Sequence, residues 1–189
     1  MTKTQQRQEI RSRLAQMPPG DKAAASSEAC RRVLGLPAYG TARALLLFSS
    51  LPDEPDTASL LARAWQDGKQ VFFPRVRPDG AFLEIRAVAA REHLRPGAFG
   101  IAEPDPACCP ETSPTLLDFA RGPGLAFDRS GHRLGRGRGY YDRLLAEISP
   151  ACFRAGFFFA CQELAEVPRE PHDQRLHAVV TEREILPVF

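Results

Sequence analysis

The feature that most limits the fold of this chain is the alternation of short apolar runs with segments of helical periodicity. Residues 44–48 form an apolar run that ends in a Ser-Ser pair, and residues 71–73 form a second run that ends at Pro74. Both runs are typical of buried strands. The segment between them, residues 57–67, has apolar residues at helical spacing and stops at Gly68. A strand, a helix and a strand in this order predict a parallel pair with covered faces.

The same signals continue through the rest of the chain. Asp21 is the expected N-cap of a second helix. Residues 96–115 are rich in proline and have no periodicity, so we expect a long loop there. The other predicted elements are helices at 3–16, 21–36 and 140–148 and strands at 82–88, 116–119, 125–127, 152–159 and 178–181. The pattern predicts a single domain over residues 1–189 of the α/β class, with three α/β/α layers, a mostly parallel central sheet and an N-terminal helical arm.

Composition and charge argue against several classes of protein. The formal net charge of +2 is too small a basic excess for a general nucleic-acid-binding protein. No stretch approaches the roughly 18 apolar residues of a membrane span, and residues 1–16 are too polar for a signal peptide. The five cysteines include no C-x-x-C pair, and the four histidines show no metal-ligand spacing. We therefore expect reduced thiols in the cytoplasm and neither a disulfide framework nor a zinc site.

A glycine- and arginine-rich loop is the most informative segment of the chain. Gly135, Gly137 and Gly139 alternate with Arg136 and Arg138 just before a predicted helix. Glycine lets backbone N–H groups approach an anion closely, and the helix N-terminus adds a positive dipole end. Guanidinium groups supply permanent charge and forked donors for phosphate or carboxylate. The loop therefore predicts a phosphate-binding cradle, although neither the P-loop pattern nor the G-x-G-x-x-G pattern is present.

The residues next to this loop extend the prediction. Tyr140 and Tyr141 offer rings that can stack on a planar ligand, and at least one of them is expected to pack into the core. Asp142 falls in the first turn of the predicted helix, where a carboxylate can hold Mg²⁺ together with phosphate oxygens. Two other interpretations remain open on the residues alone, a flexible turn with solvated arginines and an RGG-like nucleic-acid segment.

The central motif, PGLAFDRSGHRLGRGRGYYDRLL, resembles the signature of the 5-formyltetrahydrofolate cyclo-ligase family, also called 5,10-methenyltetrahydrofolate synthetases. The resemblance covers almost the whole chain. The flanking matches, each weak alone, are Lys3 with Arg7, residues 54–57 (EPDT), 73–76 (FPRV), 99–104 (FGIAEP), 170–173 (EPHD) and 179–182 (VVTE).

The resemblance implies an ATP- and Mg²⁺-dependent enzyme that cyclises 5-formyltetrahydrofolate to 5,10-methenyltetrahydrofolate. ATP would be the co-substrate, Asp142 and Asp173 the Mg²⁺ ligands, and small molecules the only partners of a monomer or weak homodimer. Arg136, Arg138 and Tyr140 would be the catalytic residues. The ATP-binding set implied is Lys3, Arg7, Arg133, Leu134, Gly135, Arg136, Gly137, Arg138, Gly139, Tyr140 and Tyr141. The substrate-binding set implied is Ser49, Glu54, Phe99, Arg136, Gly137, Arg138, Gly139 and Tyr140.

The chain departs from the family pattern at two places. His177 stands where relatives often carry Asp, and Arg121-Gly122 stands where relatives usually continue an apolar strand. Two alternatives to the cyclo-ligase remain: an ATP-dependent enzyme of the same fold that acts on another small amide, and a non-enzymatic, arginine-rich nucleic-acid-binding module.

Overall fold

The fold is built around one mixed sheet, seen in a computed structural model that describes residues 1–170 and 173–188. The strand order is β12-β11-β10-β7-β1-β2-β3-β6. The five strands from β11 to β2 are parallel, and β12, β3 and β6 are added antiparallel at the two edges. The strands are β1 (Ala44–Leu46), β2 (Gln70–Val76), β3 (Leu83–Ala87), β6 (Glu111–Thr112), β7 (Phe119–Gly122), β10 (Phe153–Phe157), β11 (Ala178–Val180) and β12 (Ile185–Pro187).

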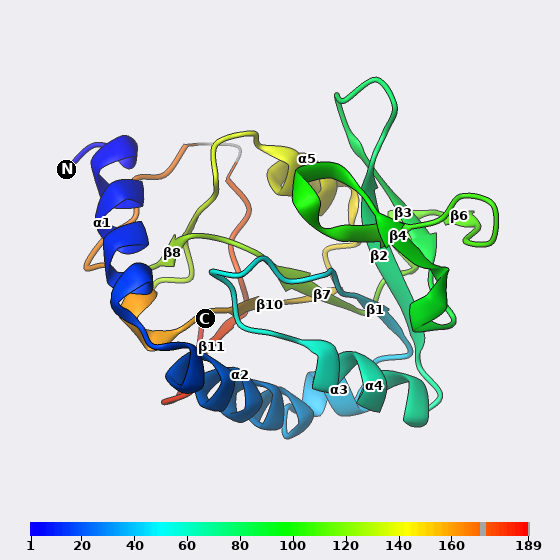
Figure 1. The fold of residues 1–189 in the computed structure, drawn as a ribbon, viewed down its shortest axis with the longest axis horizontal. Coiled ribbons are helices and arrows are strands. Elements are labelled where there is room, and N and C mark those ends of the chain that lie inside the picture. Colours follow the sequence, from blue (N-terminus) through cyan, green and yellow to red (C-terminus); the bar gives the residue numbers. More distant parts are fainter. Residues whose placement is uncertain (171–172, 189) are drawn as a thin grey trace.

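Helices cover both faces of this sheet, which confirms the predicted α/β class and mostly parallel sheet. Helices α2 (Pro19–Leu34), α3 (Pro37–Thr41) and α4 (Ala58–Gln66) lie on one face, and α5 (Tyr140–Glu147) lies on the other (Figure 1). Successive residues of a strand point to opposite faces, and the core follows this rule. Leu45 packs with α2 and α4, whereas Leu46 packs with Leu144 and Leu145 of α5.

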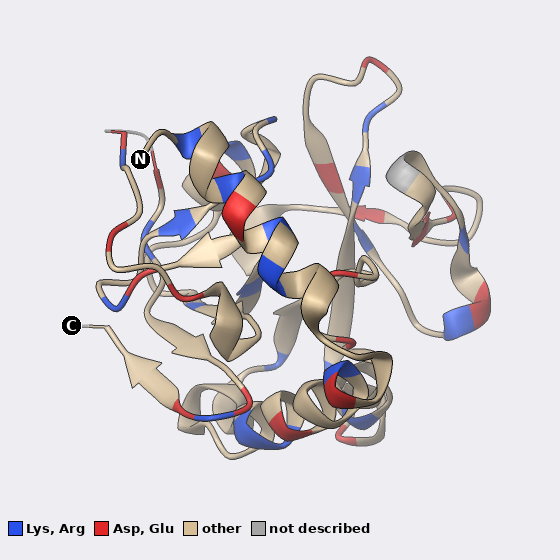
Figure 2. Cartoon of the chain, turned by 60° about the vertical axis from the view of Figure 1, so that its left-hand side comes forward, with Lys and Arg blue, Asp and Glu red and all other residues tan. Residues whose placement is uncertain are grey.

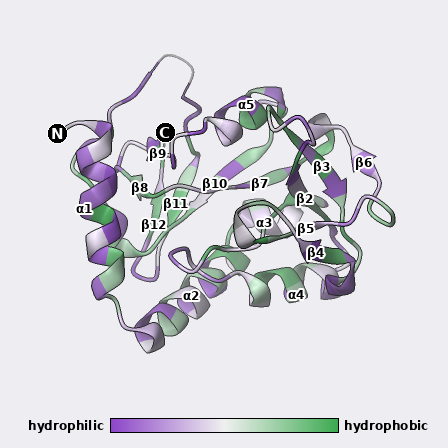
Figure 3. Cartoon of the chain, turned by 45° about the horizontal axis from the view of Figure 1, so that its top comes forward, coloured by the Kyte–Doolittle hydropathy of each residue, from purple (hydrophilic) through white to green (hydrophobic). Residues whose placement is uncertain are grey.

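The N-terminal helix α1 (Lys3–Gln16) is confirmed at the predicted bounds. It packs against the main body rather than projecting from it, because Ile10 and Leu14 are fully buried against Leu134 and Phe159. In Figure 3 the helices carry both hydrophobic and hydrophilic residues, as expected for helices with one buried side. Helix α1 thereby packs beside the hairpin of β8 (Ala126–Phe127) and β9 (Arg133–Leu134).

Two boundary predictions are wrong for reasons that concern proline. Strand β2 continues through Pro74, because Val71 and Arg77 carry ladder bonds with β3 and Pro74 falls at a non-bonded position between them. Its missing N–H therefore removes no bond of the ladder. Helix α2 begins at Pro19, not after an Asp21 cap, because proline suits the first helical position. Asp21 instead lies in the first turn, where a carboxylate favours the dipole.

The long loop predicted at residues 96–115 is also wrong in part. The segment contains the end of β4 (Leu94–Pro96), β5 (Ala102–Pro104), β6 and the 3-10 turns η2 (Ala98–Gly100) and η3 (Pro114–Leu116). Strands of two or three residues are too short to show a period in the sequence. Strand β7 runs on through Arg121 and Gly122, where a side chain on Gly122 would lie 2.8 Å from Leu176.

Among the described residues, none of the helices has the length and apolar character needed to cross a membrane.

Candidate active site

A cavity of about 370 Å³ lies at the carboxyl ends of the central parallel strands. Its walls come from the segment after β1, from β2, and from the segment after β7. The chain leaves β1 toward β2 on one side, and β7 pairs with β1 on the other. Such a switch in strand order is where open α/β sheets bind ligands. The cavity is lined by Phe48, Ser49, Leu51, Glu54, Pro74, Val76, Leu83, Ile101, Ala102, Glu103, Pro123, Gly124, Arg133, Gly135, Arg136, Arg138, Gly139, Tyr140, Tyr141 and Asp142.

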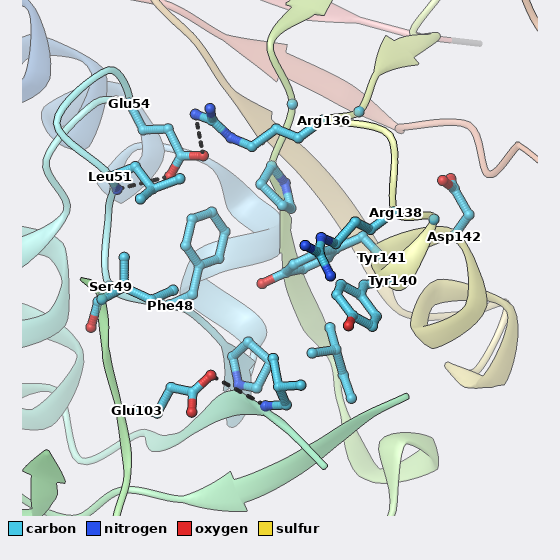
Figure 4. A pocket seen from close by; sticks show the side chains of 18 of the residues that line it. Phe48, Ser49, Leu51, Glu54, Glu103, Arg136, Arg138, Tyr140, Tyr141 and Asp142 are labelled. Carbon is cyan, nitrogen blue, oxygen red and sulfur yellow. Dashed lines mark hydrogen bonds and ion pairs between the residues drawn. The ribbon is translucent and has the colours of Figure 1, made fainter. Parts of the chain in front are cut away.

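The glycine loop forms one wall of this cavity and has the conformation that its glycines permit. Gly137 has φ 110° and Gly139 has φ 64°, a region that other residues rarely adopt. Gly139 is also the N-cap of α5, so the loop passes directly into a helix N-terminus. Arg138 and Tyr140 lie next to each other on this wall (Figure 4). The predicted arrangement of a glycine loop that opens a helix is therefore present.

Arg136 spans the cavity to reach two carboxylates of the loop after β1. Its guanidinium donates to Asp53 at 2.5 and 3.1 Å and to the Oε1 atom of Glu54 at 3.2 Å. Glu54 is buried, and its other oxygen accepts the N–H of Leu51 at 3.1 Å (Figure 4). Burial acts to lower the pKa of Arg136, but the two carboxylates outweigh it and raise that pKa. Asp53 does not line the cavity, but its ion pair holds the guanidinium of Arg136 beside Glu54.

A second group of charges lies at the α5 side of the cavity, around the buried side chain of Arg133. Arg133 donates to Asp142 at 2.5 Å and also to the backbone oxygen of Gln174. Burial lowers the pKa of Arg133, and the negative charges of Asp142 and Asp173 oppose that shift. The Nζ atom of Lys3 lies 3.7 Å from Asp173. The fold therefore brings Asp142 and Asp173 near one guanidinium, with Lys3 beside Asp173, although the three are far apart in the sequence.

Other residues of the predicted nucleotide set lie behind the loop. Arg7 donates to the backbone oxygen of Gly135 at 2.9 Å, and a Cβ on Gly137 would lie 3.8 Å from the Cζ atom of Arg7. Leu134 does not line the cavity, because its side chain is buried against α1 in the core. Basic and acidic residues are interspersed along the chain (Figure 2). The arginines of the loop thus belong to a chain with a formal net charge of only +2.

The two tyrosines differ in their surroundings. Tyr140 donates to the backbone oxygen of Gly80 at 2.6 Å. Tyr141 packs edge-on against Phe48, with ring centroids 5.6 Å apart, which confirms the prediction that one tyrosine packs inward. Its hydroxyl oxygen is buried and has no hydrogen-bond partner among the described residues. Burial raises the pKa of Tyr141, so its hydroxyl keeps its proton at neutral pH.

Ser49 donates to the backbone oxygen of Ala102 at 2.8 Å and so ties the loop after β1 to β5. Glu103 is buried at the opposite end of the cavity from Glu54 and accepts the N–H of Val76 at 3.2 Å (Figure 4). The backbone of Phe99 lies in η2, and its side chain is outside the described part of the structure. Sequence reasoning did not single out Phe48 or Glu103, although Glu103 lies in the FGIAEP segment that resembled the family.

Arg121 is the least expected residue near the cavity. It sits in central strand β7, is 0% exposed, and stacks 3.8 Å from the centroid of Phe48. Its guanidinium donates to Ser50 and to the backbone oxygen of Pro55, each at 3.2 Å. Its Nε atom is buried with no partner among the described residues. Arg121 therefore links strand β7 to the loop that carries Ser49 and Glu54.

The fold and the cavity together define an α/β enzyme with an arginine-lined cleft suited to anionic ligands. The profile of the 5-formyltetrahydrofolate cyclo-ligase family matches residues 1–182, and the chain belongs to this family. The family is one of ligases, so the non-enzymatic alternative has no support.

Individual relatives agree with this assignment. The 5-formyltetrahydrofolate cyclo-ligase of Escherichia coli K12 is 30% identical over 181 residues, which cover 93% of this chain and 98% of the relative. The cyclo-ligase of Mycolicibacterium smegmatis is 33% identical over 144 residues, or 74% of this chain and 73% of the relative. The NMR structure of the Aquifex aeolicus 5,10-methenyltetrahydrofolate synthetase superposes with a TM-score of 0.88 at 27% identity, covering 100% of this chain and 93% of the other.

Proposed function

We propose that this protein uses ATP and Mg²⁺ to convert 5-formyltetrahydrofolate to 5,10-methenyltetrahydrofolate, with release of ADP and phosphate. The observation that carries the proposal is the composition of one cavity. The cavity has a glycine and arginine wall at one side and a buried carboxylate, Glu54, at the other. Phosphate groups suit the first wall, and the N–H donors of a pterin ring suit the second.

The nucleotide end is proposed to be the loop of residues 135–139 together with the N-terminus of α5. Backbone N–H groups of this loop and the guanidinium of Arg138 would contact the phosphates. Arg7 supports the loop through its bond to Gly135, and Lys3 stands near Asp173. We propose that both bring positive charge to the phosphate tail of ATP.

The folate end is proposed to be the floor formed by Phe48, Glu54 and Tyr141. Glu54 would accept from the donor nitrogens of the pterin. The buried hydroxyl of Tyr141 needs a partner, because buried polar atoms are almost always hydrogen-bonded. A polar atom of the folate would supply it. Ser49 and Phe99 stay in the proposed substrate set.

The proposed chemistry overcomes the low reactivity of an amide. The formyl group on N5 is an amide, so its carbon is a weak electrophile. Transfer of the γ-phosphoryl group from ATP to the formyl oxygen turns that oxygen into a leaving group and releases ADP. N10 then attacks the formyl carbon and loses its proton to solvent, the five-membered ring closes, and phosphate departs with the oxygen. Arg136, Arg138 and Tyr140 would hold the formyl and phosphoryl groups in line and stabilise their charge.

Asp142 and Asp173 are the proposed ligands of Mg²⁺. Their chemistry fits, because Mg²⁺ prefers one or two carboxylates together with phosphate oxygens and water. Both carboxylates act on the same guanidinium, that of Arg133, so they belong to one charged group beside the glycine loop. When bound, Mg²⁺ would supply charge neutralisation at the phosphates of ATP.

We also propose that the protein works in the cytoplasm as a monomer or weak homodimer. All five cysteines are free thiols, as expected in a reducing compartment.

The test of the proposed function is an absorbance assay for methenyl-folate formation by the purified protein. We expect product only when 5-formyltetrahydrofolate, ATP and Mg²⁺ are all present. Glu54→Gln and Asp53→Asn each weaken an ion pair with Arg136, but only Glu54 is proposed to bind the pterin. We therefore expect the KM for the folate to rise more in Glu54→Gln than in Asp53→Asn. Product formation without ATP, or no product with all components, would contradict the proposal.

A further inference from the structure

A cluster of soft metal ligands lies outside the proposed active site. His93, Cys108 and Cys109 offer ligand atoms that all lie within 4.8 Å of one another. Within residues 1–170 and 173–188, no second group of three or more His, Cys, Asp or Glu side chains meets this condition. None of the three residues lines the cavity described above. The expectation from the sequence that the cysteines and histidines form no metal site is therefore incomplete, because it considered only spacing along the chain.

The two sulfur atoms are placed as a tetrahedral metal ion would require. The Sγ atoms of Cys108 and Cys109 lie 3.9 Å apart. Zn–S bonds of about 2.3 Å in a tetrahedral site put two sulfurs about 3.8 Å from each other. Both thiols are free, and a disulfide would need its sulfurs at about 2 Å. The two adjacent side chains can thus bind the same ion without a change in their separation.

The imidazole of His93 supplies an independent reason to expect a ligand. Its Nδ1 atom is buried and has no hydrogen-bond partner among the described residues. The backbone of the same residue is held in place, because its oxygen accepts the N–H of Asp105 at 2.9 Å and lies 3.7 Å from the Sγ atom of Cys109. The ring of His93 therefore offers a ligand atom within 4.8 Å of both thiols and also has a buried nitrogen without a partner among the described residues.

The position of the cluster gives it a role in the fold. His93 directly precedes β4, and the two cysteines follow β5, so the three residues stand at the base of the β4–β5 hairpin. This hairpin carries Ile101, Ala102 and Glu103 to the cavity. An ion bound at its base would link positions 16 residues apart and restrict the hairpin.

We propose that His93, Cys108 and Cys109 form a binding site for a zinc-type divalent ion that holds the β4–β5 hairpin in place. Two thiolates and an imidazole select zinc over Mg²⁺, and a water molecule completes the tetrahedron. Binding releases the two thiol protons to solvent and involves no change of oxidation state.

The experiment uses Co²⁺ as a spectroscopic substitute for zinc on the reduced, full-length protein. Co²⁺ bound by thiolates gives an intense near-ultraviolet charge-transfer band, whereas Co²⁺ bound by carboxylates does not. We expect one equivalent per chain to develop this band and added zinc to remove it. The variants are Cys108→Ser, which changes an exposed thiol, and His93→Gln; the matched control is Cys161→Ser, and Asp142→Asn serves as the control for the proposed Mg²⁺ site.

The outcomes separate the proposal from its alternatives. We expect Cys161→Ser and Asp142→Asn to keep the band. Cys108→Ser and His93→Gln should weaken Co²⁺ binding by more than the roughly 10- to 100-fold that loss of an outer-shell partner costs. Amide exchange in residues 94–104 should slow when zinc is added to the wild type and not when it is added to Cys108→Ser. Absence of the band in fully reduced wild type, or its persistence in either Cys108→Ser or His93→Gln, overturns the proposal.

Discussion

Arg121 offers the sharpest test of how the site is held together. The perturbation is Arg121→Met, which keeps an apolar side chain against Phe48 and removes the guanidinium. The hydroxyl oxygen of Ser50 and the backbone oxygen of Pro55 then each lose one hydrogen bond from a charged donor, although Ser50 still donates to Pro55. Each of these bonds contributes about 1 to 3 kcal/mol, so the local loss is about 2 to 6 kcal/mol.

An opposite effect limits the change in global stability. Arg121 is fully buried, and its hydrogen-bond partners within residues 1–170 and 173–188 include no carboxylate. Removal of its charge relieves a desolvation penalty of several kcal/mol. The two effects have similar size, so we expect the free energy of unfolding to change by no more than about 2 kcal/mol. The damage should instead be confined to residues 48–57.

The assay is hydrogen exchange resolved by segment, together with steady-state kinetics. A local loss of 2 kcal/mol corresponds to about thirtyfold faster amide exchange in residues 48–57. The KM for 5-formyltetrahydrofolate should rise more than kcat falls, since this segment carries Glu54. Arg63→Met is the matched control, because Arg63 lies half-exposed on α4. Unchanged exchange in residues 48–57 of Arg121→Met would refute the reasoning, and so would an equal increase over the whole chain.

Four further predictions follow from the site. Arg138→Ala should lower turnover by about 100-fold and leave the melting temperature unchanged, because it removes roughly 3 kcal/mol of transition-state stabilisation. Near-normal turnover of this variant would exclude Arg138 from the mechanism. Asp142→Asn should raise the Mg²⁺ concentration needed for half-maximal rate at fixed ATP, and an unchanged requirement would count against a ligand role. Tyr141→Phe should leave stability toward urea equal or higher, because the lost hydroxyl has no hydrogen-bond partner among the described residues. Folate binding measured by calorimetry should weaken, and an equal folate affinity would contradict the proposed contact. Burial lowers the pKa of His177 from 6.5, and its Nδ1 atom accepts the backbone N–H of Arg154. The neutral ring therefore contributes its full stabilisation above pH 6.5, and this contribution is lost as pH falls through the lowered pKa. The urea midpoint of His177→Asn should decline less steeply with falling pH than that of the wild type, and parallel curves would rule out the effect.

The parts of the fold that the sequence predicted are those with a strong local signal. Helix 3–16 was bounded by its period and by Pro18, and the strand at 44–48 by its apolar run. Local rules failed where tertiary pairing decided the outcome. Pro74 is tolerated in β2 only because of the register with β3, and strands as short as β5 exist only through their partners. No window of sequence contains that information.

The residues of the candidate site also differ in whether a local sequence signal identifies them. The loop of residues 135–139 could be recognised because glycine and arginine have few other reasons to alternate before a helix. Phe48 and Glu103 carry no such signal, since one looks like any strand residue and the other like any surface carboxylate. Arg121 was visible as a departure from the family pattern, but only its complete burial shows that it supports the loop bearing Glu54.

The ion pairs of Arg136 have a consequence for the order in which ligands arrive. If Arg136 contacts the nucleotide as proposed, a nucleotide that enters first must separate this arginine from both Asp53 and Glu54, so its binding is an exchange of partners and gains less than the capture of a free cation. Once a folate has engaged Glu54, one of those partners is already occupied elsewhere. Under the proposed roles, each ligand should bind more tightly in the presence of the other, and by linkage the gain should be the same in both directions.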